Sequence, residues 1–246
     1  MDNDEVSERI DPKGLWLAAR LLLIGVVISA LSGIFHAEGP DANDHPNVFV
    51  IYAASQSWTA VHFDQFIGMA VITGGLLALH FAVRARDGLG LWLNRFALLS
   101  AGVAVALYGV LQAVDGVGLK HAVDAWASAR DADKTARFDA AETVRWLEWG
   151  VRSYHSFVFG LALILFGIVI VLLRPVPRSI GFLMAISGLC YFVQGWIIGT
   201  NGFSSANQIP TLLGIVLVVV WTVWLLIAAL RMRTTRRDDA TTSSTP

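Results

Sequence analysis

Charged side chains are scarce in this chain, and their scarcity excludes a water-soluble globular fold. Only 15% of the 246 residues are Asp, Glu, Lys or Arg, whereas 55% are hydrophobic, and the mean hydropathy is +0.60. This composition leaves too little polar surface to cover a soluble domain of this size. The formal net charge of −1 also argues against a nucleic-acid partner. We therefore expect the lipid bilayer to surround most of the chain.

Cysteine and proline are sparse as well. The single cysteine, Cys190, excludes an internal disulfide. Prolines near the hydrophobic segments stand at loop positions, namely Pro46, Pro175, Pro177 and Pro210, so no segment is visibly interrupted. Many secondary transporters have broken helices and internal repeats. Continuous segments and the lack of a convincing repeat therefore count against a transporter of that familiar kind.

Six hydrophobic segments are long enough to cross a bilayer. A membrane helix needs about 20 apolar residues to span about 30 Å of hydrocarbon. The segments are 15–36, 58–83, 90–114, 147–173, 179–200 and 209–231. We predict an all-α fold, a polytopic membrane helix bundle of about six transmembrane helices, with the transmembrane domain covering 15–231.

Positive residues at the segment ends predict the orientation, because Lys and Arg are retained on the cytoplasmic side. The short loops 37–57 and 201–208 contain neither, which places them outside. Cytoplasmic ends are marked by Arg9, Lys13, Arg84, Arg86, Arg95, Arg174, Arg178, Arg231, Arg233, Arg236 and Arg237. Both termini are predicted to be cytoplasmic. They comprise the N-terminal segment 1–14 and the polar tail 232–246, whose composition predicts disorder.

Two outer connections contain further predicted structure. The segment 115–145 begins with an imperfect helical period, which predicts a short amphipathic helix lying on the bilayer as an outer interfacial segment. The loop 37–57 contains VFVIYAAS, an apolar run too short to cross the membrane and long enough to lie at the interface. We expect this run to cap the outer face.

Small residues at four-residue spacing predict close helix contacts inside lipid. They form three sets, which are Ala70, Gly74 and Ala78, then Ser156 and Gly160, then Gly195 and Gly199.

Polar and ionisable residues within the segments gather in the predicted outer half. An ionisable side chain at membrane depth costs at least about 2.5–3.5 kcal/mol unless it is paired or hydrated. In segment 147–173 and the residues just before it, Arg145, Glu148, Arg152 and His155 recur at three- or four-residue steps and share one helix face. We expect Glu148 and Arg152 to pair at i,i+4.

Because the inner half is almost wholly apolar, these residues predict an outward-facing polar pocket closed on the cytoplasmic side. It would bind a small polar ligand or cation. Each residue could instead be a hydrogen-bonded interfacial group without a ligand. The expected ligand-binding residues are His62, Gln65, Gln112, Asp115, Glu148, Arg152, His155 and Gln194.

Several functions fit this pattern, and the sequence leaves both catalysis and cofactor undecided. A sensor or transporter for a small polar solute requires the least specific chemistry from these residues. A zinc-dependent membrane hydrolase would use His62, His155 and His121 with Asp115 or Glu148. A b-type haem between His62 and His155 and a purely structural role are further alternatives. No zinc motif such as HExxH is present, so no metal ligands are assigned from the sequence.

Three runs carry a resemblance to a known family. They are HPNVFVIYAASQSWTAVHFDQFIGM, LQAVDGVGLKHAVDAWA and VRWLEWGVRSYHSFVFGLAL. Together they resemble a family of uncharacterised bacterial six-helix integral membrane proteins, over about residues 15–231. The resemblance implies a multi-pass protein of the bacterial inner membrane, the plasma membrane. That family has no established activity, so the resemblance assigns no catalytic residue.

Overall fold

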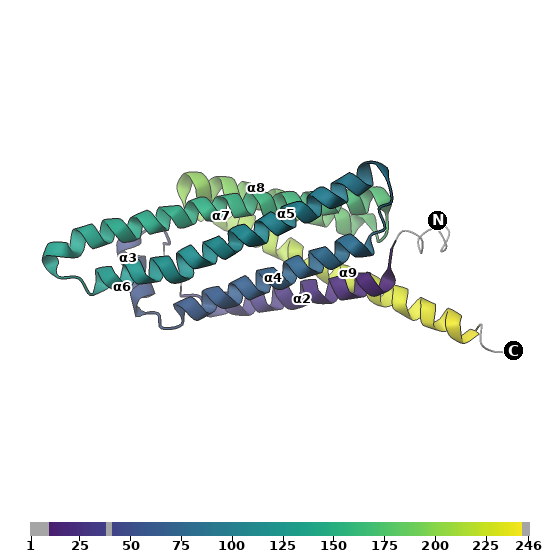
Figure 1. Cartoon of the computed structure of the whole chain (residues 1–246), viewed down its shortest axis with the longest axis horizontal. Helices are drawn as coiled ribbons and strands as arrows, with labels where there is room; N and C mark the ends of the chain where they lie inside the picture. Colours follow the sequence, from purple (N-terminus) through teal and green to yellow (C-terminus); the bar gives the residue numbers. More distant parts are fainter. Residues whose placement is uncertain (1–9, 38–40, 243–246) are drawn as a thin grey trace.

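The computed structural model describes residues 10–37 and 41–242, with side chains described as far as Thr234, and this part of the chain is helical (Figure 1). Six of its helical segments are long and apolar enough to cross a membrane, which confirms a multi-pass, all-α bundle. The elements are α2 (Pro12–Ile34), α3 (His45–Ala54), α4 (Trp58–Ala82), α5 (Gly88–Ala113), the π-helix η1 (Val114–Leu119), α6 (Lys120–Ala127), α7 (Asp131–Leu173), α8 (Arg178–Asn201), the 3₁₀-helix η2 (Ser205–Asn207) and α9 (Gln208–Thr242).

The start of α2 and the end of α9 lie at the same end of the bundle, here named the terminal end (Figure 1). The opposite end carries α3 and α6 and is named the α3 end. An even number of spans requires this arrangement, whichever side of the membrane each end faces.

The last helix extends into the tail that was predicted to be disordered. It runs as α9 as far as Thr242. Residues 243–246 of that tail, and residues 1–9 of the predicted N-terminal segment, lie outside the described residues.

Helix ends follow local chemistry. The Asp11 side chain accepts hydrogen bonds from the backbone N–H groups of Lys13 (3.1 Å) and Gly14 (3.0 Å), which caps the start of α2. Helix α7 ends at Arg174, whose φ of 54° is left-handed, and Pro175 follows. The chain then reverses direction and begins α8.

Glycine lets α7 and α8 approach closely. A Cβ atom at Gly160 would lie 2.6 Å from the Gly188 carbonyl oxygen, and Gly195 and Gly199 are equally confined by Ser153. These contacts confirm the small-residue predictions for both helices.

In α4 the prediction was wrong, because a Cβ at Gly74 would meet nothing within 4 Å. The close contact of α4 with α2 uses Gly68 instead, on another face of the helix.

An apolar core fills the half of the bundle nearest the terminal end. Its members come from α2, α4, α5, α7, α8 and α9, so the core binds the spans to one another. Fully buried examples are Leu15, Leu22, Leu76, Leu79, Leu163 and Ile170. The buried histidine, carboxylate and arginine side chains lie in the other half of the bundle.

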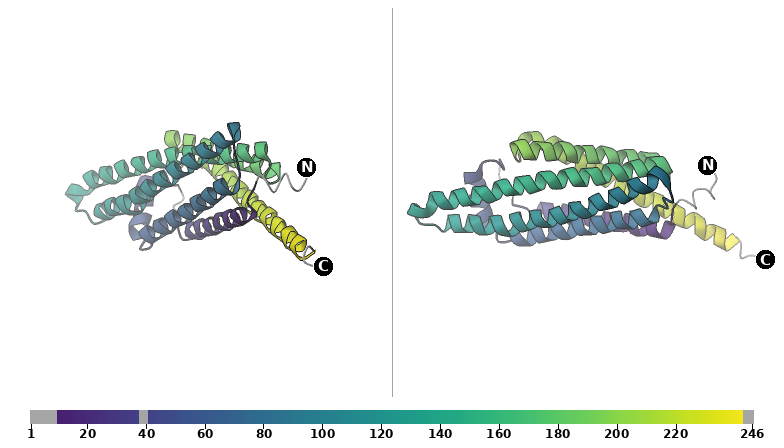
Figure 2. Two further views of the ribbon diagram at one scale, coloured as in Figure 1. Left: turned by 45° about the vertical axis from the view of Figure 1, so that its right-hand side comes forward. Right: turned by 45° about the horizontal axis from the view of Figure 1, so that its top comes forward.

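Helices α5, η1 and α6 follow one another in nearly the same direction and form a long hairpin with α7 (Figures 1 and 2). A helix therefore exists where the amphipathic one was predicted to lie on the bilayer, and it continues the direction of α5. Its apolar face is buried by protein: Val123 packs in one cluster with Leu119 of η1, Ala141 of α7, and Val48 and Phe49 of α3. The short helix α3 covers this part of the α3 end.

Candidate functional site

A cavity of about 850 Å³ lies among α2, α4, α5, α7, α8 and α9. Along α7 its lining runs from Arg145 to Phe159, about 21 Å at the helical rise of 1.5 Å per residue. The part nearest the α3 end is polar and is bordered by residues 41–43 and 203–205; the deeper part is lined by apolar residues that include Val26, Met69, Ile72, Ile215 and Val218. The cavity is therefore amphipathic along its length.

Most of the predicted ligand-binding residues line this cavity. They are Gln65, Gln112, Asp115, Glu148, Arg152 and His155. His62 contacts Asp115 from behind the wall. Gln194 is not part of the lining: it accepts a hydrogen bond from Ser156 (3.0 Å) and donates one to Thr211 (2.7 Å), which links α7, α8 and α9.

The predicted pair of Glu148 with Arg152 is wrong, because Glu148 pairs with Arg145. The Arg145 guanidinium donates to Glu148 Oε2, and both residues are buried, at 3% and 2% exposure. Rings of Tyr52 and Phe203 hold the guanidinium carbon at 5.5 and 4.9 Å from their centroids. These rings come from α3 and from the segment after α8, so the choice of partner depends on tertiary structure.

Arg152 consequently has no carboxylate partner. Within the part of the chain whose side chains are described, no Asp or Glu oxygen lies within 4.0 Å of its nitrogens. Its guanidinium carbon lies 5.9 Å from the Tyr108 ring centroid, and its Nε is buried without a hydrogen-bond partner. A cation facing a cavity at membrane depth favours an anion beside it.

His155 offers two further unused polar atoms. The side chain is 3% exposed, it lines the cavity, and neither ring nitrogen has a hydrogen-bond partner among the described residues. Its ring contacts Tyr108 at 4.7 Å and stacks on Phe159 at 5.8 Å, centroid to centroid. Buried polar groups are normally hydrogen-bonded, so these atoms favour a ligand or water in the cavity.

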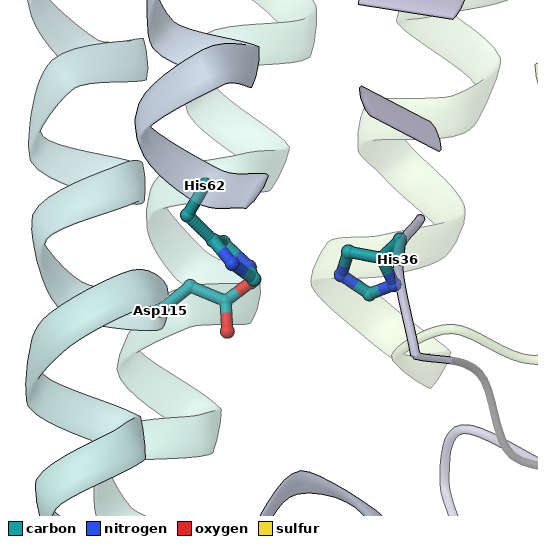
Figure 3. A group of neighbouring side chains, drawn as sticks. All are labelled: His36, His62 and Asp115. Atoms are coloured by element: carbon teal, nitrogen blue, oxygen red, sulfur yellow. The ribbon is translucent and has the colours of Figure 1, made fainter. Parts of the chain in front are cut away.

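A second group lies at one side of the polar part: His36 follows α2, His62 is in α4 and Asp115 is in η1. Figure 3 shows His62 and Asp115 side by side, with the His36 ring facing them. His62 Nε2 lies 3.0 Å from Asp115 Oδ2, and one ligand atom from each of the three residues lies within 4.8 Å of the others.

The surroundings of this group change the acid–base behaviour of two residues outside the spans. Burial lowers the pKa of His36 to about 4. The imidazole of His36 is therefore neutral at pH 7. Burial raises the pKa of Tyr52 to about 12, so this cavity-lining phenol keeps its proton at pH 7.

The two metal-based alternatives differ from this geometry. His121 is exposed, and within the described residues neither it nor His155 belongs to a group of three potential metal ligands. The bis-histidine haem does not fit well, since His62 Nε2 faces Asp115.

Sequence reasoning missed His36, which lies in a bend outside any helical period. It also left Arg145 out of the site, although Arg145 shares the helix face of Glu148.

Comparison with known proteins gives a family and no activity. No curated protein and no solved structure matches the chain. Residues 17–229, which are most of the chain, match a family described as "Domain of unknown function (DUF4386)". With its six candidate spans, this multi-pass membrane protein therefore belongs to the DUF4386 family.

Proposed function

We propose that this protein binds a small amphiphilic anion in the cavity, as a solute sensor or transporter. The observation that carries the proposal is the guanidinium of Arg152, which faces the cavity without a carboxylate partner in the described part of the chain. A carboxylate or phosphate group can accept two parallel hydrogen bonds from a guanidinium. The anion would supply the charge that the protein does not.

The other arginine of the polar part already has a partner, because Arg145 pairs with Glu148. His155, three residues from Arg152 on α7, adds a ring nitrogen that can hydrogen-bond the same ligand. These contacts favour an anionic head group over the cation that the sequence left open.

The apolar part of the cavity favours a ligand with an apolar tail. From Arg152 to Phe159 the wall extends about 10 Å along α7. Met69, Ile72 and Val218 line the space on other helices. Binding sites for small molecules are commonly apolar with a few placed polar groups, as here.

The proposed direction of access is from the outside. Among the described residues an apolar core fills the terminal half, and the positive residues at that end support an orientation of this half towards the cytoplasm. The membrane we propose is the bacterial plasma membrane.

The test compares two probes with the same chain length, decanoate and uncharged decanol, on the full chain purified in nonionic detergent. We expect decanoate to raise the unfolding temperature saturably and decanol to raise it much less. A ligand at 100 times its Kd stabilises the folded state by about 2.7 kcal/mol. Arg152→Gln should remove most of the decanoate effect.

Arg137→Gln is the matched control, since Arg137 lies on the same helix and is exposed. It should respond to decanoate as the wild type does. Equal stabilisation of the wild type and Arg152→Gln by decanoate would contradict the proposal, and so would equal stabilisation by decanoate and decanol.

A further inference from the structure

We propose that His36, His62 and Asp115 form a binding site for one divalent transition-metal ion, with zinc or ferrous iron as the matching ions. This site goes beyond the proposed anion binding and does not depend on it. The three residues come from the end of α2, from α4 and from η1, so they meet only in the folded protein.

The hydrogen bonds of His62 prepare one of its nitrogens for a metal. Nδ1 lies 2.7 Å from the Trp58 carbonyl oxygen, and because a carbonyl only accepts, Nδ1 carries the proton. In the neutral ring, Nε2 then presents a lone pair to Asp115 Oδ2 at 3.0 Å. Two acceptors at this distance repel each other unless a proton or a metal ion lies between them.

Both groups are removed from water. His62 is 1% exposed and Asp115 8% exposed, and Asp115 Oδ1 has no hydrogen-bond partner within the described residues. Metal-binding histidines usually donate their other ring N–H to a carbonyl or carboxylate, which is the arrangement that Trp58 provides. An uncompensated carboxylate in this setting is costly, and a bound cation would compensate it.

Asp115 is held in place from α4. The Trp58 indole nitrogen donates to the Asp115 carbonyl (2.9 Å), and the Thr59 hydroxyl donates to the Gly116 carbonyl (2.7 Å). These bonds fasten the π-helix η1, a kind of distortion that occurs frequently at functional sites. Trp58 therefore positions both His62 and Asp115.

His36 completes the site by a small movement. Ligand atoms on one tetrahedral zinc lie about 3.3 Å apart for bonds of about 2.0–2.1 Å. The present separations are at most 4.8 Å, so His36 needs to approach by at most about 1.5 Å. His36 lies in a bend outside any helix, and among the described residues its ring makes no hydrogen bond that would oppose this movement.

The donor set selects the class of ion. Two imidazoles and one carboxylate suit zinc or ferrous iron, whereas calcium and magnesium prefer oxygen ligands. His36 and Asp115 line the cavity, so a fourth coordination position would face it. That open position is typical of catalytic metal sites and absent from structural ones.

The test measures metal content directly. The full chain is purified in nonionic detergent, stripped with a chelator, incubated with Zn²⁺, Fe²⁺ (under anaerobic conditions) or Mg²⁺, desalted and analysed for metal by mass spectrometry. We expect about one zinc or iron per chain and no magnesium. His36→Ala, His62→Gln and Asp115→Asn should each lower the affinity at least tenfold in competition with a chromogenic chelator.

His121→Ala is the matched control, because His121 is exposed and outside the group; it should bind metal as the wild type does. His36→Ala keeps the test decisive if the two buried variants fail to fold, and gel filtration reports folding of each. Folded wild type that retains neither zinc nor iron would overturn the proposal and identify His62 and Asp115 as a plain ion pair. Equal retention by the wild type and His36→Ala would also overturn it.

Discussion

Glu148 shows how strongly a single buried charge depends on its neighbour. Glu148 and Arg145 are both shielded from water and from lipid, and each neutralises the other. Removing one member of a buried pair typically costs about 3–5 kcal/mol, because the remaining charge is left unpaired.

We therefore predict that Glu148→Gln lowers the free energy of unfolding by about 3 kcal/mol. Thermal or chemical denaturation in detergent measures the loss. Asp139→Asn, at an exposed position on the same helix, should have little effect. Combining Glu148→Gln with Arg145→Met should recover part of the loss. If the double variant is no more stable than Glu148→Gln, the two charges do not stabilise each other.

At this scale, sequence reasoning predicted the polar face of α7 but chose the wrong partner for Glu148. The i,i+3 and i,i+4 spacings are equally compatible with a helix. Tyr52 and Phe203, which hold Arg145 near Glu148, are distant in the sequence, and nothing in the local pattern reveals them.

Among the elements, the role of η1 in positioning His62 can be tested, because Gly116 packs closely against the His62 side chain. A Cβ at Gly116 would lie 2.5 Å from the His62 Cβ, so Gly116→Ala should displace that side chain and destabilise the fold by about 1–3 kcal/mol. We also expect a lower metal affinity for this variant. Denaturation and chelator competition measure the two effects.

Gly118→Ala is the control within the same element. Its Cβ would meet neighbours only at ordinary contact distance, the nearest at 3.7 Å. It should therefore leave both stability and metal binding close to those of the wild type. Similar behaviour of the two alanine variants would show that η1 does not position His62.

The contact of α7 with α8 gives a second test at the scale of elements. Gly160→Ala would place a methyl group 2.6 Å from the Gly188 carbonyl oxygen, and we expect it to separate the helices and lower the unfolding temperature. Gly150→Ala in the same helix meets nothing within 4 Å and should be neutral or slightly stabilising. A neutral Gly160→Ala would contradict this account of the packing.

Hydrophobic length predicted the spans well, because the bilayer sets a minimum length for each of them. The direction of α6 was not predictable in the same way. An amphipathic period shows only that one face needs an apolar partner, and here that partner is α7 and α3 instead of lipid.

For the whole molecule, we predict that the α3 end faces outwards and that the terminal end faces the cytoplasm. In a Cys190→Ala background, Ser128→Cys near the α3 end should react with a membrane-impermeant maleimide in intact cells. Asp87→Cys, in the loop at the other end, should react only after permeabilisation. The positive residues at the terminal end give the physical reason. The reverse pattern of labelling would invert the proposed orientation.

The cavity illustrates what a single sequence can and cannot predict of a site. Depth along each span could be predicted from the sequence, so most of the predicted residues, including Gln112 and His155, line the cavity. The path of the chain after α2 could not be predicted from the sequence, and this path brings His36 close to Asp115.

The proposed function requires an anion held by Arg152 with its tail in the apolar part of the cavity. The most direct test is a crystal structure of the full chain with 10-bromodecanoate, in which anomalous scattering locates the bromine. We predict bromine among Met69, Ile72 and Val218, with the carboxylate at Arg152. Bromine found only on the lipid-facing surface, with the cavity free of ligand, would contradict the claim.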